Sequence, residues 1–295
     1  MGEINLVSLL PSALTLFSYK NGPDFLASFG KLHACIITVS KSNTIPERIF
    51  TKADINFVKS LNDRVFRNAS KQFVAEGSKS VLEMISSGLK LERIFALETW
   101  FKTHYGLIAG KCEPTLISEK ELARMSSLKS TRQVLGVFQM PQFRFEPTQL
   151  KGLTLVLDGL QDPGNLGTLI RLADWYGLEN ILCSDTCVDC FNPKTVQATM
   201  ASLGRVKIHY GNLPQMILAC DLPLFAAVMD GTPGRNITFP QNMLLVIGNE
   251  GQGISEEILN LKHQGITIEK YGEAESLNAA MAGAILLDRY FGQFA

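Results

Sequence analysis

The chain has 295 residues, of which 46% are hydrophobic and 19% are charged, and its formal net charge is zero. This composition is typical of a globular protein with room for two domains, and no apolar run reaches the roughly 18 to 20 residues that would span a membrane. No Lys or Arg precedes the apolar stretch near the N-terminus, so we expect no secretory signal and a cytoplasmic location.

The charges are distributed unevenly along the chain. Residues 51–140 carry 14 Lys and Arg against 9 Asp and Glu, whereas residues 151–295 carry 9 against 15. A basic front half indicates that an anionic partner docks mainly there. Chance asymmetry between two solvated surfaces is the alternative.

Residues 1–50 show no sustained period and stay unassigned, although 36–39 has the pattern of a short strand. Helical and strand-like patterns then alternate, which predicts a small α/β domain over residues 51–140. The expected elements are a helical spacing over 55–66, a strand at 73–75, a helix at 80–87, a strand at 93–97, a helix that begins at the capping box of Ser118 and Glu121, and a strand at 134–138. Residues 141–150 contain the sequence PQFRFEP and are expected to form a linker.

From residue 151 to 295, short apolar runs alternate with helical segments. The continuous runs LTLVL and MLLVI are typical of strands buried on both faces, so a mostly parallel sheet covered by helices is predicted. The expected strands are 153–158, 180–183, 205–208, 224–229, 244–247 and 266–268.

Three of the six cysteines are clustered, at Cys183, Cys187 and Cys190. A tetrahedral zinc site needs four ligands, and no matching second Cys pair is present. We therefore interpret these cysteines as free thiols and predict no metal site.

The first segment that contains candidate functional residues follows the predicted strand 153–158. Gly164 and Gly167 permit a tight turn that contains Asn165, and a helix follows. Arg171 lies about 200° around this helix from the apolar position Leu169, so its side chain is available to a cleft. A solvated arginine is the simpler alternative.

The second segment reads GNEGQGIS and begins at Gly248, directly after a predicted strand. Its glycines let the backbone approach a ligand closely. A phosphate loop would need a Lys-Ser/Thr pair after the glycines, and Glu250 would repel phosphate. A neutral or cationic ligand such as a sulfonium fits better, and a glycine-rich turn without a ligand is the alternative.

The third segment lies near the C-terminus. Ser276 is predicted to be the N-cap of a final helix that begins at Leu277 and Asn278 and continues with small apolar residues. On this pattern alone, a plain buried helix is an equal alternative.

Together, the three segments resemble the signature motifs of the SpoU/TrmH-type branch of the SPOUT methyltransferases. Asn165 with Arg171 is similar to the first motif, Gly248-Asn249-Glu250-Gly251 to the second, and Ser276-Leu277-Asn278 to the third. Asn192-Pro193-Lys194 and Ala201-Ser202-Leu203-Gly204 resemble the family's middle region. Residues 51–140 resemble the L30e-like substrate-binding domain that often precedes it. Where the family pattern has a Pro after the Ile, this chain has Ile268-Glu269-Lys270.

The resemblance implies an α/β fold in which residues 151–295 carry a trefoil knot, one of the rare exceptions to unknotted topology. It also implies a homodimer with the active site near the interface. The cofactor would be S-adenosyl-L-methionine, held between the second and third motifs, and the reaction would be methylation of a ribose 2′-hydroxyl in RNA. The RNA is expected to be rRNA, with tRNA as the alternative.

The resemblance also suggests roles for individual residues. In the family, the arginine that matches Arg171 is usually given the role of assisting proton removal from the hydroxyl. Because an arginine is effectively always protonated, we expect Arg171 instead to grip an RNA phosphate and orient the hydroxyl, with a phosphate oxygen or water taking the proton. Asn165 and Ser276 would position the nucleotide, while Glu250 and Asn278 would shape the pocket. Cofactor contacts are expected at the following residues: Gly248, Asn249, Gly251, Ile268, Leu277 and Asn278. A catalytically silent RNA-binding homologue and a small-molecule methyltransferase are the rival classes.

Overall fold

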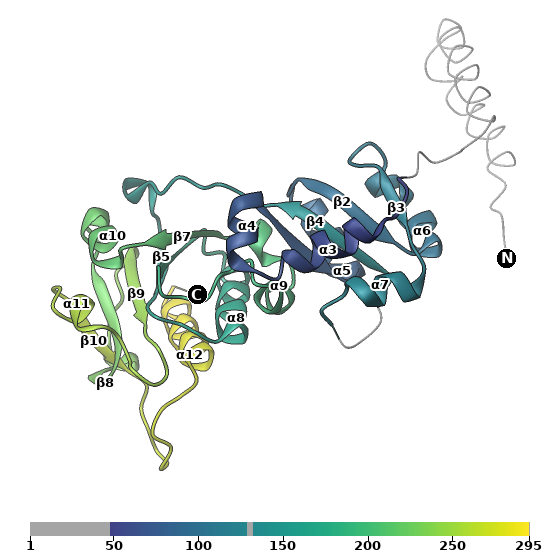
Figure 1. The fold of residues 1–295 in the computed structure, drawn as a ribbon. Coiled ribbons are helices and arrows are strands. Elements are labelled where there is room, and N and C mark those ends of the chain that lie inside the picture. The colour runs from purple at the N-terminus through teal and green to yellow at the C-terminus, as the bar shows by residue number, and fades with distance from the viewer. Residues whose placement is uncertain (1–47, 129–131, 295) are drawn as a thin grey trace, which may run out of the picture. The chain divides into compact units, whose positions relative to one another are not determined.

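The computed structural model describes residues 48–128 and 132–294. Within these ranges the chain forms two sheets in succession (Figure 1). One has the strand order β1-β4-β2-β3 and the other β10-β8-β9-β5-β6-β7. We call residues 48–140 the front module and residues 150–294 the rear module. The expected strand at 36–39 lies outside the described residues.

In the front module, helices cover a small sheet in which β4 pairs antiparallel with β1 and β2. The elements are α3 (Lys52–Ser60), α4 (Arg64–Ser70), β1 (Gln72–Glu76), α5 (Ser78–Ser86), β2 (Leu91–Ala96), α6 (Glu98–Ile108), β3 (Pro114–Leu116), α7 (Glu119–Met125) and β4 (Val134–Gln139). The capping box expected at the start of α7 is present, with the Glu121 carboxylate accepting from the Ser118 backbone N–H at 2.8 Å.

Two features of the front module differ from the sequence prediction. The helical spacing over 55–66 belongs to two helices, because Asp63 caps α4 by accepting from the Phe66 N–H at 2.9 Å. Helix α6 and the three-residue strand β3 were not predicted, since neither has a strong apolar period.

The rear module has a parallel sheet, in every pairing described for it. Its elements are β5 (Leu153–Leu157), α8 (Pro163–Trp175), β6 (Asn180–Ser184), α9 (Pro193–Thr199), β7 (Lys207–Gly211), α10 (Leu213–Cys220), β8 (Leu224–Pro233), β9 (Met243–Ile247), α11 (Glu256–Leu259), β10 (Gln264–Thr267) and α12 (Ala279–Gly292), with the short 3-10 helices η3 (Ser202–Gly204) and η4 (Gly234–Asn236). A further 3-10 helix, η2 (Pro147–Gln149), lies between the two modules in the chain. The central strands β5 and β9 are buried along their whole length, as predicted from their apolar runs.

Helices cover both faces of this sheet (Figure 1). The side chains of α10 and α11 share an apolar core with Val156 of β5 and with Leu244 and Val246 of β9, and α8 and α12 lie on the opposite face. A Cβ on Gly283 would come within 2.4 Å of Leu169, so α12 packs closely against α8 only because this residue is glycine. This contact places the starts of both helices side by side.

Two strands have different bounds from those predicted, which were 205–208 and 266–268. Strand β7 begins at Lys207 rather than at residue 205, because Arg205 closes turn η3 and its Nε donates to Asp174 at 2.9 Å. Strand β10 begins at Gln264 and ends at Thr267. Of the helices in the described residues, none is both long and apolar enough to cross a bilayer.

Candidate active site

A cavity of about 630 Å³ lies at the carboxyl ends of β9 and β10 and beside the middle of β8. Its walls are the loop that follows β9, the segment between β10 and α12, and the inner face of α12. Parallel α/β sheets bind ligands at this edge. Most of the predicted site residues line the cavity, namely Gly248, Asn249, Glu250, Gly251, Ile268, Ser276 and Leu277.

The loop after β9 is closed tightly on itself. The Asn249 and Gly253 backbones exchange two hydrogen bonds, of 2.9 and 2.8 Å, and the Asn249 side chain accepts from the Gly251 N–H at 2.8 Å. A Cβ on Gly248 would lie 2.3 Å from the Gly253 carbonyl carbon, so only glycine allows the loop to close. The Asn249 amide also donates to the Gly159 carbonyl at 2.9 Å, which joins this loop to the one after β5.

Hydrogen bonds connect the three predicted segments through their side chains. The Asn165 amide donates to the Glu250 carboxylate, and the Asn278 amide donates to the Asn165 carbonyl oxygen at 2.8 Å. The structure therefore brings together residues that lie 85 and 113 positions apart in the chain. Asn165 and Asn278 adjoin the cavity through Glu250 rather than lining it.

Two local predictions at these residues were wrong. Asn165 lies in the first turn of α8 and not in a preceding turn, because Asp162 is the N-cap and accepts from the Asn165 N–H at 2.8 Å. The N-cap of α12 is Asn278 rather than Ser276. The Asn278 side chain accepts from the Ala280 N–H at 3.0 Å, which leaves Ser276 and Leu277 in the exposed segment that borders the cavity.

Arg171 is exposed on α8, on the side away from the buried residues of that helix, as predicted. It is not among the residues that line the cavity. One turn further along α8, Trp175 is 82% exposed. In a single copy of the chain, Arg171 is thus outside the set of residues that form the cavity wall.

An ion-pair network that sequence reasoning missed holds the segment between β10 and α12. Glu269 accepts from Arg235 of η4 and from the Arg289 Nη2 of α12 at 2.5 Å, and these bonds lower the pKa of the carboxyl to about 2. Glu269 also lines the cavity. The only signal in the sequence was the acidic residue at the position where the family pattern has a Pro.

Cys183, Cys187 and Cys190 are buried free thiols. Hydrogen bonds from the Cys183 thiol and other neighbours lower the pKa of Cys187 to about 7, despite its burial. Its sulfur accepts from the Leu160 N–H at 3.3 Å. This thiol supports the loop after β5, outside the cavity.

The chemistry of the cavity wall fits S-adenosylmethionine. The volume lies within the range of roughly 300 to 1,000 Å³ usual for small-molecule sites. Apolar side chains such as Ile247, Ile254 and Leu286 line its interior, and backbone groups of the β9 loop border it. The carboxylates Glu250 and Glu275 lie at its wall, which favours a cationic ligand over a polyphosphate.

Comparison with known proteins identifies a family for each of the two modules. The SpoU rRNA Methylase family matches residues 152–288, and the MRM3-like substrate binding domain matches residues 52–136. The 23S rRNA (guanosine(2553)-2′-O)-methyltransferase RlmP of Bacillus subtilis is 30% identical over 234 residues, which cover 78% of this chain and 92% of that protein.

Solved structures show the same fold. A TrmH-family protein from Porphyromonas gingivalis superposes with a TM-score of 0.74 and 30% identity, covering 82% of this chain and 98% of that one. An AdoMet-bound rRNA methyltransferase from Sinorhizobium meliloti superposes with a TM-score of 0.76 and 25% identity, covering 85% and 99%. The chain belongs to the SpoU family of RNA methyltransferases.

Proposed function

We propose that this protein transfers a methyl group from S-adenosylmethionine to a ribose 2′-hydroxyl in RNA, with rRNA as the substrate. The observation that carries the proposal is the hydrogen-bonded chain of Glu250, Asn165 and Asn278 beside the cavity, which unites the three motifs. The B. subtilis relative acts on 23S rRNA, which favours rRNA over tRNA.

The cofactor, when bound, supplies a methyl group on a positively charged sulfur. Backbone groups at Gly248, Ile268 and Leu277 would hold it, since all three line the cavity. Asn249 and Gly251 would act indirectly by fixing the closed shape of the β9 loop. The apolar walls would exclude water, which strengthens the electrostatic interactions inside the site.

The chain's own residues would then place the ribose oxygen in line with the methyl carbon, at about 3 to 3.5 Å. Asn165 and Ser276 would position the nucleotide. Glu250 and Asn278 would hold the Asn165 amide in a fixed orientation, because one accepts from its nitrogen and the other donates to its oxygen. A positioned amide loses little entropy when it binds a substrate.

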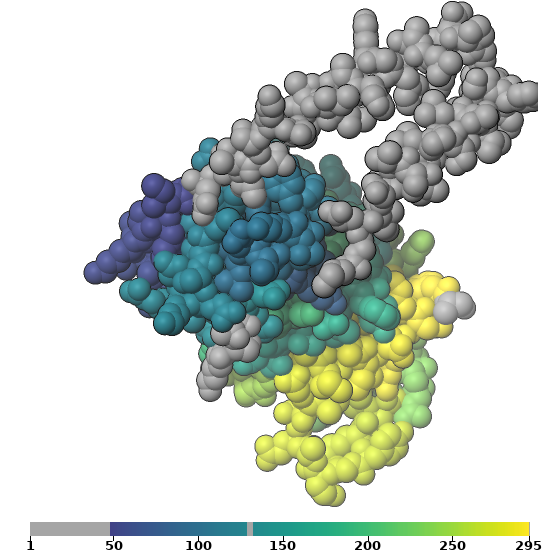
Figure 2. Space-filling view, turned by 90° about the vertical axis from the view of Figure 1, so that its right-hand side faces the viewer, coloured from purple at the N-terminus to yellow at the C-terminus, as the bar shows by residue number. Residues whose placement is uncertain are grey.

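Arg171 would bind an RNA phosphate and orient the 2′-hydroxyl. A guanidinium stays protonated throughout the accessible pH range, so a phosphate oxygen or a water molecule would take the proton. Two copies of the chain, packed through α8 and α12, would complete the site with Arg171. Along these helices Trp175 is 82% and Met281 57% exposed, and Figure 2 shows α12 (yellow) uncovered at the surface.

The domain assignment completes the proposal. Residues 51–140 would dock RNA through their excess of basic side chains, residues 141–150 would link the domains, and residues 151–295 would form the methyltransferase domain. The proposal includes a cytoplasmic location, because the B. subtilis relative acts on a bacterial 23S rRNA. Residues 1–50 have no assigned role.

The decisive experiment incubates the purified protein with tritiated S-adenosylmethionine and with rRNA or tRNA from cells that lack the protein. We expect label in rRNA at a 2′-O position, mapped by resistance of the adjacent phosphodiester to alkaline cleavage. Label in tRNA alone would support the alternative substrate. Cofactor and RNA binding without transfer would identify a catalytically silent homologue.

A further inference from the structure

The front and rear modules meet at a junction formed by α4 and β1 on one side and by residues 188–192 with α9 on the other. A cavity of about 240 Å³ lies between the modules beside α9, and the rest of the junction is in direct contact. The rings of Phe73 and Phe191 pack with their centroids 4.9 Å apart. At the edge of the junction, a Cβ on Gly204 would lie 1.9 Å from the Ser87 hydroxyl. The two modules therefore touch without space for an additional side chain at these points.

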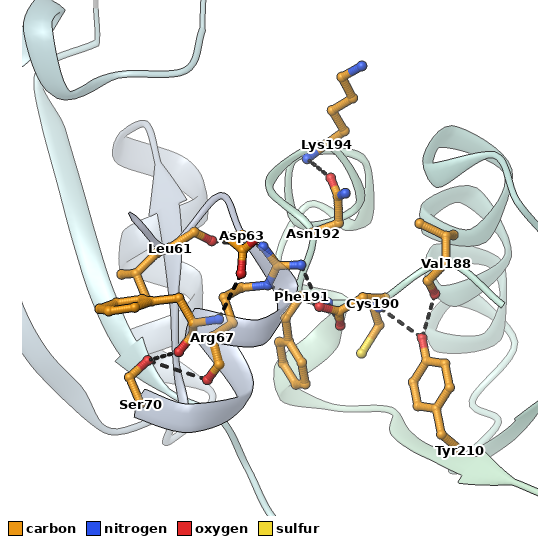
Figure 3. Close-up of polar contacts among 12 residues, drawn as sticks. Leu61, Asp63, Arg67, Ser70, Val188, Cys190, Phe191, Asn192, Lys194 and Tyr210 are labelled. Carbon is orange, nitrogen blue, oxygen red and sulfur yellow. Dashed lines mark hydrogen bonds and ion pairs between the residues drawn. The ribbon is translucent and has the colours of Figure 1, made fainter. Parts of the chain in front are cut away.

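One buried ion pair crosses this junction. Arg67 of α4 is only 2% exposed, and its Nε and Nη2 donate to one carboxylate oxygen of Asp189 at 3.0 and 2.6 Å (Figure 3). Its Nη1 donates to the Leu61 carbonyl at 2.8 Å. All three nitrogens are thus engaged, and the planar guanidinium fixes the direction as well as the distance of the contact.

Asp189 transmits this constraint into the rear module. Its second carboxylate oxygen accepts from the Phe191 N–H at 2.9 Å. On the other side of the segment, the Tyr210 hydroxyl accepts from the Cys190 N–H at 2.8 Å and donates to the Val188 carbonyl at 2.7 Å (Figure 3). Residues 188–191 are therefore held from both modules, immediately before Asn192, the N-cap of α9.

Helix α9 in turn packs directly on α8. A Cβ on Gly167 would come within 2.5 Å of the Ala198 side chain and 3.0 Å of the Thr195 carbonyl, so the helices touch through their backbones. Asn165 lies two residues before Gly167 in α8 and is bonded to Glu250 at the cavity. A contiguous series of packed elements thus leads from Arg67 to the site.

We propose that Arg67 and Asp189 are positioning residues for methyl transfer: they fix the front module relative to the cavity, so that RNA docked on the front module presents its ribose at the cavity. The inference rests on the proposed function. Apolar packing such as that of the two phenylalanines has no preferred direction, whereas a buried guanidinium–carboxylate pair permits one geometry. Loss of one partner would leave a buried charge and open the junction.

The test compares Arg67→Met, Asp189→Asn and the conservative Arg67→Lys with the wild-type protein. We expect kcat/KM for rRNA to fall roughly 10- to 100-fold in the first two, because a small misplacement of the substrate slows transfer to this extent. Arg67→Lys keeps the charge without the planar fork and should lie in between. The Kd for S-adenosylmethionine should change less than about twofold, since the cavity is formed by the rear module alone.

A second readout monitors the junction without catalysis. Amide hydrogen exchange over residues 188–199 should accelerate in Arg67→Met and Asp189→Asn. Arg48→Met is the matched control, because Arg48 also pairs with an aspartate, Asp54, at 2.6 Å, but entirely within the front module. It should change neither the exchange over 188–199 nor the cofactor Kd.

Each contrary outcome has a distinct meaning. Accelerated exchange with unchanged RNA methylation would overturn the positioning role, and so would parallel losses of cofactor affinity and methylation, which indicate damage to the rear module. If Arg67→Met does not fold, Asp189→Asn, which keeps the side-chain shape, gives the same comparison. A wild-type protein that methylates no RNA would instead refute the proposed function.

Discussion

Arg171 is a predicted site residue that does not line the cavity in the single chain. If it binds an RNA phosphate, Arg171→Ala should lower the turnover of rRNA methylation on the order of 100-fold or more, because charge contacts in the transition state contribute at this scale. The Kd for S-adenosylmethionine, measured by calorimetry, should stay unchanged. Arg144→Ala in the exposed linker is the control, and equal turnover of both variants would refute the assignment.

Glu269 is a second residue whose substitution can be tested, and we expect its loss to change the affinity for the cofactor. Glu269→Gln removes the charge that holds Arg235 and Arg289, so the segment that borders the cavity should loosen and the Kd for S-adenosylmethionine should rise several-fold. Lys262→Gln, at an exposed position before β10 and outside the cavity, should leave the Kd near that of the wild type. Equal affinities of the two variants would show that the network does not support the cofactor segment.

The depressed pKa of Glu269 predicts a pH dependence for this network. A carboxyl whose pKa falls from the ordinary 4.5 to about 2 in the fold contributes stability fully above about pH 4.5 and loses it as the pH falls toward 2. Cofactor affinity should therefore show no titration attributable to Glu269 between pH 5 and pH 9. A cofactor titration in that range that disappears in Glu269→Gln would contradict the assignment.

At the residue scale, the sequence predicted the motif residues of the site better than the ion pairs that hold the surrounding segments in place. Asn165, Glu250 and Asn278 belong to recognisable motifs, and the structure brings them together. Arg235 and Glu269 lie 34 positions apart in an ion pair with no periodic pattern, so only the folded chain reveals it. The same holds for Arg67 and Asp189, which are separated by 122 positions.

At the scale of elements, the start of α12 offers the clearest test. Asn278→Ala removes the N-cap and the bond to Asn165, so the free energy of unfolding should fall by about 1 to 2 kcal/mol. Ser276→Ala should leave it within about 0.5 kcal/mol, since Ser276 is exposed and caps nothing in the described structure. Urea unfolding measures both, and a greater loss for Ser276→Ala would restore the original capping prediction.

Helix and strand types were predicted well where apolar residues follow a regular period, as in β5, β9 and α8. The start of β7 is shifted because Arg205 closes η3 and pairs with the Asp174 side chain. The misplaced cap of α12 has a different cause, which is competition between neighbouring polar residues for backbone partners. Ser276 and Asn278 are both good N-caps, and the tertiary bond between Asn278 and Asn165 favours the second. The choice between two possible N-caps therefore depends on tertiary contacts, which the local sequence pattern does not reveal.

At the scale of the whole molecule, the proposed dimer predicts that a charge on the α8–α12 surface separates the subunits. Trp175→Glu should yield a monomer in light scattering after gel filtration, because burial of a charged group in an apolar interface is unfavourable. Val65→Glu is the control, since Val65 is 77% exposed on the front module. A wild-type protein that is itself monomeric at working concentration would refute the dimer.

The order of the two modules followed from the charge asymmetry and the change of pattern near residue 141. The contact between the modules through Arg67 and Asp189 could not be predicted from the sequence, because residues that meet across two modules show no local periodic pattern. The trefoil knot implied by the family resemblance stays a prediction.

The tightly closed loop after β9 has a consequence for mutational tolerance. In a saturation library selected for cofactor binding, position 248 should accept glycine alone, because any larger residue collides with the Gly253 backbone. Position 272, on the segment across the cavity, should accept many residues, since no atom lies within 4 Å of a Cβ placed there. Two glycines of the same site, at positions 248 and 272, would thus differ sharply in their tolerance of substitution.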